Sequence, residues 1–73
     1  MKAAELTAKL KSQGREATRL DSATVAVRVP QERLYRESAA LRRETGWKTV
    51  GEYDPATGAC RVVLRDVASA ESK

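Results

Sequence analysis

The sequence predicts a small α+β domain in which a long helix packs on one face of a three-stranded antiparallel sheet. Three observations lead to this fold class: alternating valines at 23–29, a helix-favouring run at 30–45, and two β-favouring runs within 47–67. The chain has 73 residues, enough for a single domain, which we expect over residues 1–67. The predicted order is helix, strand, helix and β-hairpin.

Residues 1–14 consist mainly of good helix formers. Ala3, Leu6 and Leu10 recur at helical spacing, and Gly14 is a natural end for the helix. Because the stripe holds only two large apolar side chains, this helix is marginal by itself. We expect the segment either to dock on the domain as a short helix or to form an N-terminal arm.

Residues 15–22 are polar except for Leu20 and are interpreted as a connector that can extend a strand. Asp21 and Ser22 have the side chains that favour a turn before the next element. Residues 23–29 then alternate, which predicts a half-buried strand. One face of this strand holds Val25, Val27 and Val29, and the other holds Thr24, Ala26 and Arg28.

Residues 30–45 predict the main helix. Pro30 suits its first position because the fixed φ of proline fits a helix and its missing donor is not needed there. The face directed at the core is narrow and consists of Leu34, Ser38, Leu41 and Thr45. Gly46 predicts the end of the helix, and Trp47 can fold back against its last turn.

Residues 47–67 predict a β-hairpin whose loop contains Pro55 and Gly58 at suitable turn positions. The side chains expected to point inward are Trp47, Tyr53, Val62 and Leu64, whereas Val50 and Val63 point the other way. Residues 68–73 are expected to be a disordered tail.

The composition argues against catalysis. The chain has no histidine and a single cysteine, Cys60, so it lacks the ligands of a common zinc site and the pairs that activate a serine or cysteine nucleophile. We therefore expect no enzyme, no metal and no cofactor.

Neither a membrane-spanning run nor a signal-peptide core is present, and we expect a cytoplasmic protein of a bacterial host with no membrane partner.

The formal net charge is +4, and the basic residues are concentrated in residues 1–50. This imbalance favours an anionic partner, either an acidic protein surface or nucleic acid. Candidate binding residues are the arginines of the strand and the main helix, with two aromatic side chains as apolar anchors: Arg28, Arg33, Arg36, Arg43, Tyr35 and Trp47. The alternative is a solvated helix surface on which Glu32, Glu37 and Glu44 pair with the arginines.

The stretch TVAVRVPQERLYRESAALRR, within residues 23–46, resembles the first half of a ribbon-helix-helix repressor. The resemblance implies a dimer formed through residues 24–29, with Thr24, Ala26 and Arg28 facing the major groove of DNA. The chain departs from that family after Gly46, where a hairpin is predicted in place of the second helix.

In size and character the chain also resembles the small host-takeover proteins that phages direct against bacterial RNA polymerase. This resemblance implies a non-enzymatic transcription regulator. Its basic residues would dock on an acidic surface of the polymerase, and it would inhibit the enzyme by blocking or displacing a factor. A DNA-binding repressor and a small structural subunit are the alternatives. Both a monomer and a homodimer are compatible with the sequence.

Overall fold

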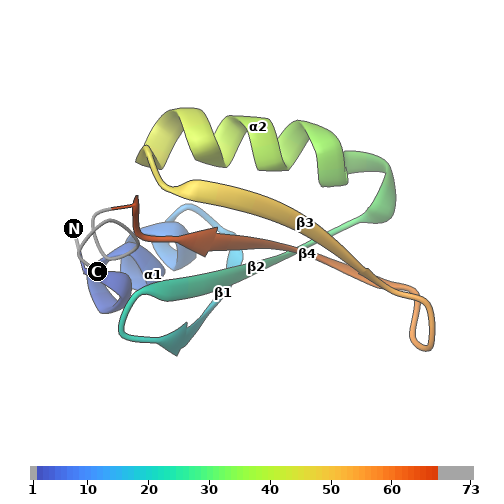
Figure 1. The fold of residues 1–73 in the computed structure, drawn as a ribbon, viewed down its shortest axis with the longest axis horizontal. Coiled ribbons are helices and arrows are strands. Elements are labelled where there is room, and N and C mark those ends of the chain that lie inside the picture. The colour runs from blue at the N-terminus through green and yellow to red at the C-terminus, as the bar shows by residue number, and fades with distance from the viewer. Residues whose placement is uncertain (1, 68–73) are drawn as a thin grey trace.

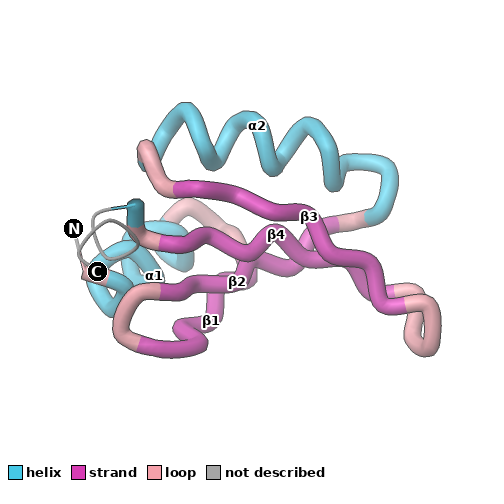
Figure 2. The backbone as a smooth tube through the Cα atoms, in the orientation of Figure 1, coloured by secondary structure: helices cyan, strands magenta, loops and turns pink. Residues whose placement is uncertain are grey.

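The computed structural model describes residues 2–67 and shows a small α+β domain with two helices and one antiparallel sheet (Figures 1 and 2). The predicted α+β class, the presence of two helices, the central strand and the hairpin are confirmed. The predicted start of the second helix at Pro30 is wrong, because Pro30 has an extended ψ of 148° and a 3₁₀ turn precedes the helix, which begins at Leu34. The predicted order also lacks one strand. The sheet has four strands where three were predicted. In chain order the elements are α1 (Ala3–Ser12), β1 (Glu16–Asp21), β2 (Thr24–Val29), a 3₁₀ turn (Gln31–Arg33), α2 (Leu34–Thr45), β3 (Lys48–Asp54) and β4 (Ala59–Arg65).

The additional strand is β1, within the segment interpreted as a connector. It pairs antiparallel with β2 through a tight turn, in which the Ala23 N–H donates to Asp21 Oδ1 at 2.8 Å. Only Ala17 of this strand is buried, and the other five residues are exposed. An edge strand with one small inward side chain lacks the apolar alternation by which strands are predicted.

The centre of the sheet is the pair β2–β4. The strand order is β1-β2-β4-β3, and every neighbouring pair is antiparallel. On one face the cross-strand partners are Val25 with Leu64, Val27 with Val62, and Val29 with Cys60. All six side chains belong to the buried core, so the predicted inward face of residues 23–29 is confirmed.

Both helices pack on this same face, which makes a two-layer fold. Helix α1 covers β1 and β2, and α2 covers β3 and β4 (Figure 1). Leu6 and Leu10 of α1 and Leu41 of α2 complete one continuous core with the valines of the sheet. The other face of the sheet carries no helix among residues 2–67.

Helix α2 ends at Gly46, as predicted. Gly46 has a φ of 73°, in the left-handed region, and its N–H donates to the Arg42 carbonyl at 2.9 Å. The chain then turns back, and the Trp47 N–H donates to Thr45 Oγ1 at 3.1 Å. The Trp47 side chain is 6% exposed and belongs to the core.

The prediction that Tyr53 points into the core is wrong, because its side chain is 50% exposed. Tyr53 lies near the tip of the β3–β4 hairpin, which projects beyond the end of α2 (Figure 1). No helix among the described residues covers the sheet there. Trp47, Val62 and Leu64 are buried as predicted. The predicted tail at 68–73 lies outside the described residues.

We predict that Gly46→Ala destabilises the domain by about 1 kcal/mol, because a side chain at a left-handed φ is strained. Gly46→Asn should cost less, since asparagine tolerates this conformation better. Urea unfolding of the three proteins measures both changes. Equal stability of the alanine variant and the wild type would contradict the role of Gly46 in ending α2.

Candidate binding surfaces

The first candidate surface lies on the outward side of α2. Arg36, Ala39 and Arg43 are exposed and lie opposite the buried Leu41 at helical spacing. We call these three residues the α2 ridge. Arg33 is also exposed and lies just before the first turn of the helix. The ridge thus contains two of the predicted binding arginines, Arg36 and Arg43, and the third, Arg33, precedes it by three residues.

The glutamates of α2 are held on a different flank of the helix by Arg15. This residue follows α1 and donates from Nη2 to Glu44 Oε2 at 3.0 Å and from Nη1 to Glu44 Oε1 at 3.4 Å. Its Nε lies 3.7 Å from Glu37 Oε1. One cation from the α1–β1 connection therefore binds both acidic side chains in the body of α2.

The contact with Arg15 also changes the titration of Glu44. The hydrogen bond from Arg15 lowers the pKa of this carboxyl below its ordinary value, and the positive charges of Arg15 and Lys9 act in the same direction. The carboxylate of Glu44 is therefore favoured in the folded protein.

The arginines of α2 have no such partners. Among residues 2–67, the ion pairs join Arg15 to Glu37 and Glu44, and Arg61 to Glu52. None involves the arginines of the α2 ridge, Arg33 or Arg42. In the described part of the chain the arginines of α2 therefore make no ion pair with Glu37 or Glu44, both of which pair with Arg15 instead.

The second candidate surface is a groove of about 1000 Å³ between α2 and the edge strand β3. At its floor α2 approaches β3 closely, since a Cβ at Gly51 would lie 3.2 Å from Leu34 Cγ. Hydroxyl groups also join the two elements: Thr49 Oγ1 donates to the Ser38 carbonyl at 3.2 Å. The lining contains two arginines and no acid: Gln31, Leu34, Tyr35, Ser38, Ala39, Arg42, Arg43, Thr49 and Gly51.

Tyr35 stands at this groove with 92% of its surface exposed. Large hydrophobic side chains that are exposed in the described chain number four: Leu20, Tyr35, Val50 and Tyr53. Three of them belong to α2 or β3. Exposed apolar surface is thus concentrated around one edge of the sheet.

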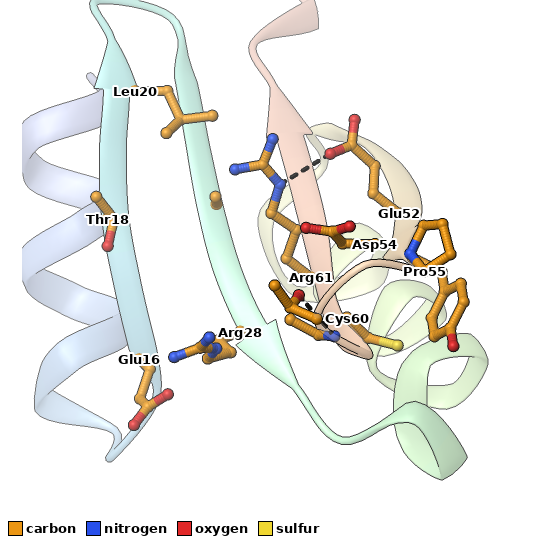
Figure 3. A pocket seen from close by; sticks show the side chains of 13 residues that line it. Glu16, Thr18, Leu20, Arg28, Glu52, Asp54, Pro55, Cys60 and Arg61 are labelled. Carbon is orange, nitrogen blue, oxygen red and sulfur yellow. Dashed lines mark hydrogen bonds and ion pairs between the residues drawn. The ribbon is translucent and has the colours of Figure 1, made fainter.

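The third surface is the open face of the sheet, shown in Figure 3 with the helices behind it. The strand register places a row of charged residues across it: Glu16, Arg28, Arg61 and Glu52. Arg61 Nε donates to Glu52 Oε1 at 2.8 Å. A shallow groove of about 960 Å³ on this face is lined by Arg28 and Arg61 together with Glu16, Glu52 and Asp54. Its charge is mixed.

The three residues that the repressor resemblance directs to DNA lie on this open face. Thr24 is 7% exposed and Ala26 is 6% exposed, so of the three only Arg28 has much surface to offer a partner. Strand β2 pairs with β1 on one side and with β4 on the other. Both of its backbone edges are occupied, which leaves none for the intermolecular ribbon of that family.

The predicted binding residues therefore separate into three places. Arg33, Tyr35, Arg36 and Arg43 lie on or beside α2, Arg28 lies on the opposite side of the sheet, and Trp47 lies in the core. Sequence reasoning missed Arg15, whose role depends on a contact between residues 29 positions apart. It also left out Arg42, although the helical spacing of Arg42 from Tyr35 could have indicated that both flank one groove.

Within the described residues, no group of three or more His, Cys, Asp or Glu side chains could hold a metal ion. No helix in this part of the chain is long and apolar enough to cross a membrane. Comparisons with protein-family models, with curated proteins and with solved structures find no match.

We predict that Arg15→Gln lowers the free energy of unfolding at neutral pH by about 0.5 to 1 kcal/mol, since the pair with Glu44 is partly exposed. The pKa of Glu44 is lowered in the folded state, so its contribution is present above the ordinary value of about 4.5 and is lost as pH falls through the folded pKa. The stabilities of variant and wild type should therefore converge in acid. Urea unfolding over a pH series measures this.

Arg19→Gln is the matched control, because Arg19 is exposed and makes none of the ion pairs found in residues 2–67. It should change stability little at any pH. A deficit of Arg15→Gln that stays constant well below the Glu44 pKa would contradict the electrostatic origin of its effect.

Proposed function

We propose that this chain is a non-enzymatic binding module that docks on an acidic surface of a partner protein through the α2 ridge. The observation that carries the proposal is the separation of charge on α2. Glu37 and Glu44 are bound by Arg15 on one flank, while Arg36 and Arg43, on the outward side, make none of the ion pairs found in residues 2–67. The two glutamates within α2 are held by Arg15, and the exposed Glu32 before the helix makes none of the ion pairs found in residues 2–67. A rigid helix that presents arginines in this way favours acidic groups on a partner.

The ridge is better suited to this role than the open face of the sheet. There Arg61 is bound to Glu52, and Arg28 lies across the strand from Glu16. An incoming anion would have to compete with these carboxylates. The modest net charge of +4 and the burial of Thr24 and Ala26 also favour a protein partner over sequence-specific reading of DNA.

The bacterial RNA polymerase implied by the resemblance to host-takeover proteins is a partner of the required chemistry. Binding of the ridge to an acidic region of the polymerase would inhibit transcription by blocking or displacing a factor that uses the same region. This mechanism needs no catalytic residue in the chain itself.

We predict that Arg36→Glu/Arg43→Glu abolishes binding to purified bacterial RNA polymerase, because two attractive contacts become repulsive. The wild-type chain should bind with an affinity that falls as salt rises. Arg19→Glu/Arg28→Glu is the matched control: it changes the net charge equally, at exposed strand residues, and should bind like the wild type. Surface plasmon resonance with immobilised polymerase measures all three proteins.

Two outcomes would contradict the proposal. Binding that is lost in the control and kept in the ridge variant would transfer the function to the open face of the sheet. Nuclease-sensitive retention of the wild-type chain on duplex DNA, with no binding to polymerase or to other acidic proteins, would favour the nucleic-acid alternative.

A further inference from the structure

The edge strand β3 has one backbone edge that pairs with no other strand among residues 2–67. Within residues 2–67, β3 pairs with β4 on one side and with no strand on the other. Its register with β4 is regular over all seven residues, whereas β1 at the opposite edge carries a register shift between Arg19 and Asp21. Solvent-exposed edges are commonly protected by bulges, proline or charged side chains; β3 has no bulge and no proline, and its charged residues are Lys48, Glu52 and Asp54.

We infer that β3 pairs antiparallel with β3 of a second copy of this chain, with Val50 opposite Val50, to form a dimer with a continuous eight-stranded sheet. Three observations favour a second copy as the occupant of this edge: the charge pattern of β3, the exposed apolar side chains around it, and the position of α2. The inference does not depend on the partner proposed for the α2 ridge, although two ridge residues, Ala39 and Arg43, also line the groove beside β3.

The charge pattern of β3 is self-complementary about Val50. In an antiparallel pair centred on this residue, Lys48 of each copy lies opposite Glu52 of the other, so one strand pair forms two opposite-charge contacts. All these side chains point to the open face of the sheet. Glu52 already accepts from Arg61 at 2.8 Å, and its carboxylate has capacity for a second cation.

The apolar side chains on the open face fit the same register. Strand pairing places Thr18, Ala26, Val63 and Val50 in one row across the four strands. Val50 ends this row and is 57% exposed. In the dimer it meets Val50 of the second copy, and the row continues without interruption across both sheets.

The position of α2 over β3 and β4 sets the spacing of the two helices in the dimer. Helix α2 packs on both β3 and β4, so in the dimer the two copies of α2 are separated by two strand spacings, about 9.5 Å. This matches the 8 to 10 Å typical of packed helices. The flank of α2 that faces the groove carries the small residues Ser38 and Ala39 together with the longer Tyr35, Arg42 and Arg43, and in the dimer these side chains line the seam between the two helices, where Tyr35 supplies apolar area.

Charge reversal tests the inference by sedimentation equilibrium and by mixing. The wild-type chain should dimerise, and Lys48→Glu and Glu52→Lys should each dimerise at least about tenfold more weakly, because both contacts become repulsive. A mixture of the two variants should form a heterodimer, since the glutamate at 48 of one chain then faces the lysine at 52 of the other, and the unchanged Glu52 of the first faces the unchanged Lys48 of the second. Circular dichroism confirms that each variant is folded.

Asp54→Lys is the control for register. It reverses an acid on the same face and strand, but in the Val50-centred pairing it does not face position 48, so a mixture with Lys48→Glu keeps one repulsive contact and should associate clearly more weakly than the mixture of Lys48→Glu with Glu52→Lys. A wild-type chain that stays monomeric at submillimolar concentration would overturn the inference. So would failure of the first mixture to associate, or rescue by Asp54→Lys in place of Glu52→Lys.

Discussion

The structure depends on the pairing of β2 with β4. These two strands are far apart in the sequence, and their contact brings together six buried side chains, from Val25 and Leu64 at one end to Val29 and Cys60 at the other. The remaining elements add to this pair: β1 and β3 extend it at its two edges, and α1 and α2 cover its apolar face. In a chain of this size so small a core leaves little stability to spare.

The second level of organisation is electrostatic, and Arg15 is at its centre. It lies between α1 and β1, and it reaches the flank of α2 to bind Glu37 and Glu44. The contact ties the two helices of the layer together. It also removes the glutamates as partners for the arginines of α2, so a contact that contributes to the fold determines which charges remain free on the outward side of the helix.

The extent to which the sequence could predict this structure follows from the strength of each local pattern. The alternating valines and the Gly46 stop identify β2 and the end of α2, because each leaves a periodic or conformational signal in adjacent residues. Strand β1 leaves none, since it buries only Ala17. Tyr53 alternates with its neighbours so as to point to the helix-covered face of the sheet, opposite Cys60. It is nevertheless exposed because α2 does not extend over the tip of the hairpin (Figure 1). That overlap depends on the lengths of both the helix and the hairpin.

The candidate surfaces were harder to predict than the fold for a related reason. The sequence places glutamates and arginines close together on α2, and spacing alone favours pairs within the helix. Their actual distribution depends on Arg15, which arrives from a distant segment with two hydrogen bonds to Glu44. A bidentate contact of this kind is geometrically stronger than a pair of flexible side chains on one helix. Tertiary contacts therefore decide which arginines are available to a partner. The same principle applies to β3: it lies at the edge of the sheet because of the strand order β1-β2-β4-β3, and that order cannot be predicted from the residues of β3 alone.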